Sequence, residues 1–249
     1  MKSEKQNKSV SIEALKIKIF ADGADLKEMK RMVEKPFIKG LTTNPTLMRK
    51  AGVKNYEKFI CDVLKEFPEI SISFEVFADD FPTMAHQAKK IASYGKNIYV
   101  KIPVTNTEMK STVSLIKDLT EEGIKVNVTA VMTLEQVVNI TEAIRKNTPA
   151  YISVFAGRVA DTGRDPVPIM AECLKIIKEN PSIELLWASP RELLNIFQAD
   201  QIGCHIITAT SNLIDKMDLI GKDLPSYSLD TVKMFYHDAL EAAYDISLL

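Results

Sequence analysis

Histidine and cysteine are both scarce in this chain of 249 residues. The three cysteines have no CxxC spacing, and the chain holds only His86, His205 and His237 beside Cys61, Cys173 and Cys204. This number and spacing argue against a zinc site of the usual kind and against a disulfide framework. Unpaired cysteines favour a reducing compartment, so we expect a cytoplasmic protein. If the chain is an enzyme, we expect Lys, Asp, Glu, Thr or Arg to carry its chemistry.

A surplus of charge and long apolar runs are missing as well. The 32 basic and 33 acidic residues leave a net charge of −1, which argues against nucleic acid as a partner. No apolar run reaches the roughly 18 residues needed to span a membrane, and residues 1–9 do not read as a signal peptide. The 46% of hydrophobic residues is ordinary for a globular protein, and 249 residues fit one domain better than two.

Short β-rich runs alternate with longer amphipathic stretches along the chain. Eight runs are predicted strands, at 17–21, 37–41, 70–77, 98–104, 124–129, 150–155, 183–188 and 204–209. Alternation of this kind indicates an α/β protein with a parallel sheet covered by helices. Eight units favour a single closed (β/α)8 TIM barrel. The alternative is an open doubly wound sheet, which usually has fewer strands.

The segments between and beyond the strands complete the expected organisation. Apolar spacing predicts helices that include 56–66 and 105–123, a helix opened by 189–191, and an additional C-terminal helix from about 228 to 248. A long loop is expected after Arg158. Residues 1–15 are expected to form a flexible N-terminal arm. The catalytic barrel domain would then be 16–249, with the C-terminal helix included.

Polar residues collect at the carboxyl ends of the predicted strands, where barrels of this type place their active sites. In chain order they are Asp22, Thr43, Asn44, Glu75, Lys101, Asn127, Thr129, Ser153, Arg158, Ser189 and Arg191. Seven of the eight strands contribute to this set, which is hard to explain by chance. We therefore expect a ring of polar groups that converge on one site.

Lys101 is the most informative of these residues because the run around it is otherwise suited to burial. A buried lysine costs free energy unless it is paired or neutral. A desolvated amine is a good nucleophile toward carbonyl groups and forms Schiff bases. The alternative is that Lys101 points outward and extends its charge to solvent between the helices. The acidic residues on the first and third strands favour the inward orientation.

Asp22 and Glu75 are candidates for proton transfer. Schiff-base cleavage of a C–C bond needs a base for a substrate hydroxyl and a positioned water for the imine steps. Glu75 and the Thr129 hydroxyl fit the task of holding that water. The alternative role for Asp22 is the N-cap of the following helix. The alternative for Glu75 is a salt bridge to Lys101, which a structural and a catalytic role would share.

The arginines are few and unevenly placed. The chain has six, against 26 lysines, and Arg158, Arg164 and Arg191 all follow the sixth and seventh predicted strands. Arg158 and Arg191 with Ser189 would form a bidentate anion site beside a helix N-terminus. The alternative is ordinary ion pairing on the surface.

Six motifs of the chain resemble those of the transaldolase family. They are FAD at 20–22, GLTTNPT at 40–46, VKIPVT at 100–105, GIKVNVT at 123–129, ISVFAGR at 152–158 and WASPR at 187–191. They occur in the family's order over about residues 16–216. The resemblance is closest to the short subgroup that also contains fructose-6-phosphate aldolase.

This resemblance implies a (β/α)8 barrel and a cofactor-free class I enzyme that works through an imine on Lys101. It would move a dihydroxyacetone unit between small-molecule sugar phosphates. It implies Asp22 as the acid and base of the C–C step, with Glu75 and Thr129 around the catalytic water. The implied substrate-binding residues are Thr43, Asn44, Asn127, Ser153 and Phe155, and the implied phosphate-binding residues are Arg158, Ser189 and Arg191.

Two positions separate transaldolases from the aldolase within this resemblance. Transaldolases carry Glu on the third strand and Phe on the sixth, where the aldolase carries Gln and Tyr. The chain has Glu75 and Phe155, so transfer is the leading expectation. An aldolase that releases free dihydroxyacetone is the alternative, and a non-catalytic sugar-phosphate-binding barrel is a third hypothesis. The intact set of lysine, carboxylates and threonine speaks against that third one.

The chain also departs from the family pattern. Gly23 follows Asp22 where threonine is commoner, Pro190 replaces a bulky residue, and Arg164 is an additional arginine near the phosphate end. The donor and acceptor therefore stay open, with a pentose-phosphate role as the default and another phosphorylated or sulfonated sugar as the alternative. Short members tend to form pentamer-based rings in which the C-terminal helix reaches a neighbour, so the resemblance also implies a homo-oligomer.

Overall fold

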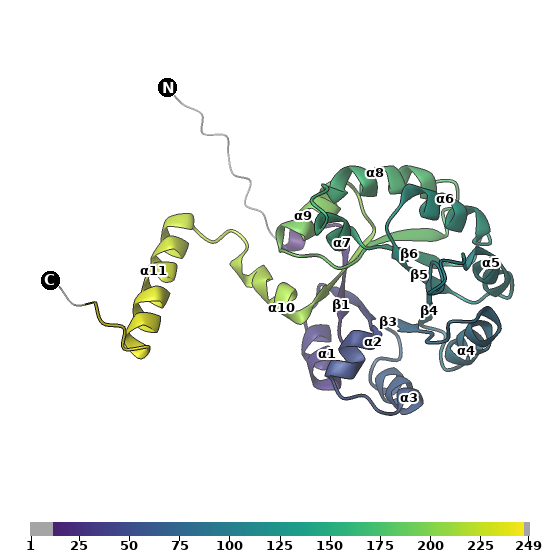
Figure 1. Cartoon of the computed structure of the whole chain (residues 1–249), viewed down its shortest axis with the longest axis horizontal. Coiled ribbons are helices and arrows are strands. Elements are labelled where there is room, and N and C mark those ends of the chain that lie inside the picture. The colour runs from purple at the N-terminus through teal and green to yellow at the C-terminus, as the bar shows by residue number, and fades with distance from the viewer. Residues whose placement is uncertain (1–11, 247–249) are drawn as a thin grey trace, which may run out of the picture. The chain divides into compact units, whose positions relative to one another are not determined.

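The computed structural model describes residues 12–246, which fall into two compact units. The larger unit, Leu15–Asp215, is a closed barrel of eight parallel strands that follow one another in chain order (Figure 1). The strands are β1 (Lys18–Asp22), β2 (Ile38–Thr42), β3 (Ser71–Glu75), β4 (Ile98–Pro103), β5 (Val126–Val131), β6 (Ala150–Val154), β7 (Ile183–Trp187) and β8 (Ile206–Thr210). The predicted (β/α)8 barrel is therefore confirmed, and the open sheet is wrong.

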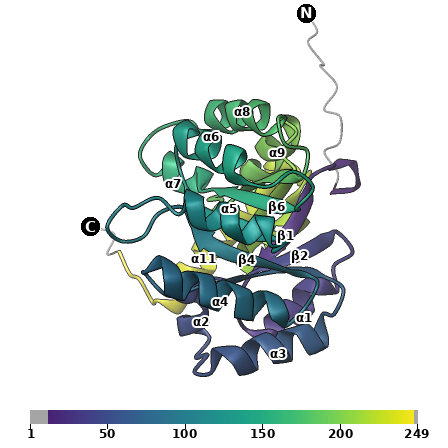
Figure 2. The ribbon, with the colours of Figure 1, turned by 90° about the vertical axis from the view of Figure 1, so that its right-hand side faces the viewer.

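Helices cover the outer face of the barrel (Figure 2). They are α1 (Leu26–Val33), α2 (Pro45–Lys50), α3 (Tyr56–Glu66), α4 (Phe81–Ser93), α5 (Val113–Glu121), α6 (Leu134–Ala143), α7 (Ala156–Ala160), α8 (Pro166–Ile177), α9 (Leu194–Gln201) and α10 (Ser211–Ile214). Each longer helix turns an apolar stripe toward the strands; in α3, the Phe59 ring meets Phe74 of β3 edge to face. No helix within residues 12–246 combines the length and apolar character that a membrane span requires.

The segment after β4 differs from the predicted helix over 105–123. Residues 105–112 form a loop closed by a bridge between Thr105 and Ser111, and α5 begins only at Val113. The Asn106 side chain accepts hydrogen bonds from the backbone N–H groups of Glu108 and Lys110. An asparagine that satisfies nearby backbone groups in this way competes with helix formation, which explains the later start.

Two further segments after strands differ from expectation. The long loop expected after Arg158 begins instead with the short helix α7, which contains that residue. The helix expected to open at 189–191 begins at Leu194. Ser189 has a backbone φ of 61°, outside the helical range, and Pro190 disfavours a helical residue before it, so the chain cannot enter a helix at this point.

The alternation of side chains along the strands divides the barrel interior into two levels. An apolar cluster of Phe20, Tyr151, Leu186, Ala188 and Ile206 fills part of the barrel interior, with Tyr151 and Ile206 near the amino ends of their strands and Leu186 and Ala188 at the carboxyl end of β7. The Tyr99 ring stacks on Tyr151 with centroids 3.8 Å apart, and Gly40 leaves the space that the Phe20 ring occupies. At the carboxyl ends, the same strands present polar side chains. The apolar cluster is thus a packed core beside the polar side chains.

The smaller unit contains the described residues outside the barrel unit. They form the 3-10 helix η1 (Ile12–Ala14), the 3-10 helix η2 (Asp215–Leu219) and the helix α11 (Leu224–Glu241). The first residue of η2, Asp215, still belongs to the barrel unit. The α11 helix begins four residues before the predicted start, because Asp223 caps it by accepting from the Ser226 N–H at 3.0 Å. Residues 1–11 of the expected arm and 247–248 of the expected helix lie outside the described residues.

Candidate active site

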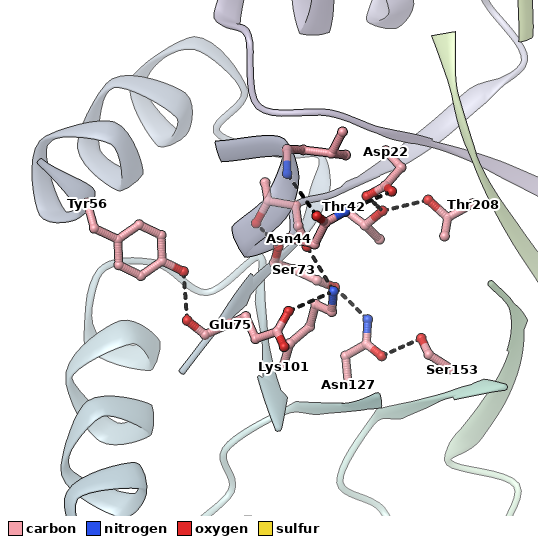
Figure 3. Close-up of polar contacts among 12 residues, drawn as sticks. Asp22, Thr42, Asn44, Tyr56, Ser73, Glu75, Lys101, Asn127, Ser153 and Thr208 are labelled. Carbon is pink, nitrogen blue, oxygen red and sulfur yellow. Dashed lines mark hydrogen bonds and ion pairs between the residues drawn. The ribbon is translucent and has the colours of Figure 1, made fainter. Parts of the chain in front are cut away.

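The register of β3, β4 and β5 brings the predicted lysine and its neighbours to one level of the barrel. Lys101 is paired with Glu75 on one side and with Asn127 on the other. The Lys101 amine lies 3.1 Å from a carboxylate oxygen of Glu75 and donates to the Thr43 carbonyl at 2.8 Å (Figure 3). Only 8% of the lysine side chain is exposed, so the outward orientation is wrong.

The burial of this ion pair between Lys101 and Glu75 restricts which substitutions the site tolerates. Removal of one partner from a buried pair leaves an uncompensated charge, at a cost of about 3–5 kcal/mol. The main chain of Glu75 is itself held, because Tyr56 of α3 donates its hydroxyl proton to the Glu75 carbonyl at 2.9 Å. The amine is thus held in the barrel interior, largely out of water, where a carbonyl substrate can meet it.

Asp22, at the end of β1, is not the N-cap of the following helix. That role belongs to Asp25, which accepts from the Glu28 N–H. The Asp22 carboxylate accepts hydrogen bonds from the Thr42 hydroxyl at 2.7 Å and from the Asn44 amide at 3.1 Å. Burial raises the pKa of Asp22, while the Lys101 ammonium and the hydrogen bonds from Thr42 and Asn44 oppose this rise. The group is therefore suited to exchange a proton.

The neighbours of Asp22 extend to β8. The Thr42 hydroxyl lies 2.6 Å from that of Thr208, and both side chains are buried. Because Thr42 donates to Asp22, the proton in the second hydrogen bond comes from Thr208. Neither threonine belonged to the predicted set. A hydroxyl in a strand is common, and only the structure shows that Thr42 donates to a carboxylate and that Thr208 donates to Thr42.

A second polar chain crosses the barrel on β3, β5 and β6. The Asn127 amide donates to the Ser73 hydroxyl at 2.9 Å, and Ser153 donates to the Asn127 amide oxygen at 2.7 Å (Figure 3). All three side chains are buried. The chain fixes the orientation of the Asn127 amide close to Lys101. Ser73 was not predicted, since a serine inside a β-run carries no sequence signal of its own.

Two of the predicted threonines have different surroundings. The Thr43 hydroxyl is fully buried and donates to the Ser73 carbonyl, so its side chain is used to hold the turn after β2. The Thr129 hydroxyl, on β5, is also buried, yet it makes no hydrogen bond to any part of the chain that the structure describes. Buried hydroxyls usually have a partner, which marks Thr129 as a group available to a small molecule.

The predicted phosphate-binding residues lie after β6 and β7. The Arg158 guanidinium stands 5.8 Å from the centre of the Phe155 ring, and Arg191 is paired with Asp161. A Cβ atom on Gly157 would lie 1.6 Å from the Ser189 carbonyl oxygen, so the glycine allows the two loops to touch. Arg158 and Arg191 are both exposed. The helix expected to open at Ser189 begins only at Leu194, and the helix N-terminus beside Ser189 is that of α7.

The remaining polar groups add little to this site. Arg164, at the phosphate end of the chain, donates to the Thr162 hydroxyl within its own turn. Among residues 12–246, no three His, Cys, Asp or Glu side chains are grouped so that they could hold a metal ion. The arrangement thus offers a buried amine, two carboxylates, an unpartnered hydroxyl and exposed guanidinium groups.

Solved structures with a similar fold come from several enzyme types. The 3-hexulose-6-phosphate synthase of Salmonella typhimurium has a TM-score of 0.56 at 14% identity, covering 83% of this chain and 97% of that one. A 2,3-dimethylmalate lyase has a TM-score of 0.53 at 10% identity, covering 93% of this chain and 86% of the lyase. At such identities the likeness concerns the barrel fold alone.

Sequence relatives are more specific. The model of the family described as transaldolase/fructose-6-phosphate aldolase matches residues 19–247. A probable transaldolase of Nitrosopumilus maritimus is 33% identical over 203 residues, which cover 81% of this chain and 87% of the relative. A probable transaldolase of Dehalococcoides mccartyi is 31% identical over 202 residues, which cover 81% and 90%. The chain belongs to the transaldolase/fructose-6-phosphate aldolase family.

Proposed function

We propose that the chain is a transaldolase that moves a dihydroxyacetone unit between sugar phosphates through an imine on Lys101. The observation that carries the proposal is the buried Lys101 amine, held 3.1 Å from Glu75 with Asp22 on a neighbouring wall of the barrel. The neutral amine attacks the ketose carbonyl, and loss of water forms the imine. The chemistry requires no metal and no organic cofactor.

Asp22 supplies the proton transfer for the C–C step. It takes the proton from the substrate hydroxyl at C4 while the C3–C4 bond breaks, and the bonding electrons pass into the iminium to form an enamine. The first aldehyde leaves, and the enamine attacks the carbonyl of the acceptor aldehyde. Asp22 returns its proton to the new alkoxide, and water then hydrolyses the imine. Each bond broken in the donor is formed again in the product.

The other residues bind the water and the substrate. Glu75 and the unpartnered Thr129 hydroxyl hold the water of the imine steps, and Asn44, Asn127 and Ser153 bind the dihydroxyacetone portion. Thr43 acts through its carbonyl, since its hydroxyl is committed to Ser73. The phosphate binds outside the barrel interior, at Arg158, Ser189 and Arg191. The pentose phosphate pathway supplies substrates of this class, and we place the enzyme in the cytoplasm.

Transfer is favoured over release of free dihydroxyacetone by the side chain directly after β6. Phe155 lies partly buried against the apolar cluster and has no hydroxyl to activate a water at the enamine. Transfer to an acceptor aldehyde then competes better with protonation and hydrolysis. An aldolase that releases dihydroxyacetone is the second candidate, because it uses the same lysine and Asp22. A barrel that only binds sugar phosphates is disfavoured, since binding alone gains nothing from a buried amine.

We further propose a homo-oligomer, with pentamer-based rings as the form that the family resemblance suggests. No residue of α11 is buried, and its exposed apolar residues include Val232, Phe235, Tyr236 and Leu240. Such a helix is stabilised by docking on another surface. Sedimentation velocity should give an assembly above the 27.9 kDa monomer, which Phe235→Asp dissociates and the control Lys233→Glu on the same helix leaves intact. A monomeric wild type would contradict this.

Borohydride trapping tests the imine directly. With fructose 6-phosphate, the reduced adduct should map to Lys101 and should be absent in Lys101→Met, whose turnover should fall by more than about a thousandfold because the nucleophile is gone. Lys125→Met is the matched control, because burial lowers the pKa of the Lys125 amine, which lies just before β5 and outside the candidate site. An adduct that persists without Lys101, or none in the wild type while sugar phosphate still binds, would contradict the proposal.

The pH profile tests the role of Asp22. Cleavage needs the ionised carboxylate, so activity should fall as pH drops through the raised pKa of Asp22. Thr42→Val removes a hydrogen bond that lowers this pKa, so the acidic limb of the cleavage rate should move to higher pH. Thr208→Val keeps the bond from Thr42 to Asp22 and serves as the control with a smaller shift. A limb that stays in place or moves to lower pH in Thr42→Val would contradict the assignment.

The product ratio tests the preference for transfer. With erythrose 4-phosphate as acceptor, the wild type should form sedoheptulose 7-phosphate, and Phe155→Tyr should increase the share of free dihydroxyacetone. Phe155→Leu controls for the change in packing, because it alters the shape of the site and introduces no hydroxyl. If the two variants give the same ratio as the wild type, Phe155 does not decide between the two activities.

A further inference from the structure

The hydrogen-bonding edge of Arg191 is already occupied by a carboxylate of the same chain. Its Nε donates to one Asp161 oxygen at 2.8 Å, and its Nη2 makes a short contact with the other oxygen. These are two parallel N–H groups, the geometry with which a guanidinium binds a phosphate. The pair lies at the exposed mouth of the site, with 46% of the Arg191 and 50% of the Asp161 side chain accessible.

Asp161 is held in this position by its own helix. It is the C-cap of α7, where its N–H bonds to the carbonyls of Gly157 and Val159, and it lies on the chain three residues after Arg158. Hydrogen bonding to Arg191 lowers the pKa of Asp161, and the charge of Arg158 acts in the same direction. The group is therefore an anion at neutral pH, paired with Arg191 and close enough to Arg158 to be influenced by its charge.

We propose that Asp161 is a specificity-determining residue that competes with the substrate for Arg191. The inference rests on the anion site of the proposed function. In the free enzyme the Asp161 carboxylate is hydrogen-bonded to the Arg191 guanidinium. An incoming tetrahedral oxyanion of the substrate displaces this carboxylate. The charges of the Arg158 and Arg191 guanidinium groups and of the Asp161 carboxylate add up to a single net positive charge at the site. Asp161 thus weakens binding of the head group and shortens its stay, without contact with the reacting carbons.

The size of the effect follows from the exposure of the pair. Exposed ion pairs contribute little, so displacement of Asp161 should cost about a twofold to fivefold loss in affinity. The free-energy cost of displacing Asp161 is the same in the substrate complex and in the transition state, because the head group does not change during the reaction. Removal of the carboxylate should therefore lower KM and leave kcat unchanged.

The test compares Asp161→Asn with Asp62→Asn. The control makes the same chemical change in another exposed pair, that of Lys58 and Asp62 on α3, and adds the same charge to the protein. Asp161→Asn should lower KM for fructose 6-phosphate and the inhibition constant of inorganic phosphate, each by about twofold to fivefold. KM for fructose, which has no head group, should stay at the wild-type value. Asp161→Ala should show the same direction, which separates the charge from the amide.

The outcomes distinguish this inference from the proposed function. If inorganic phosphate inhibits the wild type and both Asp161 variants equally, the competitor role of Asp161 is wrong and the phosphate site stands. If KM rises in both variants while their thermal unfolding matches the wild type, Asp161 holds Arg191 in place for the substrate, which also overturns the proposal. If phosphate inhibits no form and fructose and its phosphate have the same KM, the phosphate site itself is wrong.

Discussion

The ion pair between Lys101 and Glu75 is the constraint on which the upper half of the barrel depends. A parallel barrel fixes which side chains face its interior, and the register of β3 and β4 brings this lysine and this glutamate to the same level. Neither charge could lie there alone without a cost of several kcal/mol. The pair therefore meets a requirement of folding and, at the same time, keeps an amine out of water. The Thr43 carbonyl and the Tyr56 hydroxyl hold the two residues from neighbouring elements.

The same pair influences the protonation of Asp22. Two carboxylates face one ammonium, and the Asp22 pKa responds to both of the other groups, lowered by Lys101 and raised by Glu75. The hydrogen bond from Thr42 also lowers this pKa. In the proposed function the attacking amine is neutral, so Asp22 then lacks the cation that favours its ionised form.

The sequence was most informative where a residue contradicts its surroundings. Lys101 could be found because a charge inside a β-run needs an explanation, and the period of the strands placed it with Glu75. The sequence did not predict roles for Ser73, Thr42 and Thr208. Small residues with a hydroxyl group are ordinary in strands, and the direction of their side chains depends on the strand register. The loop at 105–112 was missed because the predicted helix was extended back from apolar residues that begin only at Val113. At 105–112 the Asn106 side chain satisfies the backbone locally. The pair of Asp161 and Arg191 joins residues thirty positions apart on separate loops.

The two ends of the site are subject to different physical limits. In the interior, each polar group depends on buried partners, so a change at Lys101, Glu75 or Asp22 alters both stability and chemistry. At the mouth, the cations are exposed and their interactions are weak, so in the proposed function a change there acts on affinity. Gly157 joins the segments that follow β6 and β7, because its missing side chain lets α7 lie against the Ser189 carbonyl. If Lys101 and the two arginines have the roles proposed above, such a barrel can change the anion it prefers without any change in its lysine.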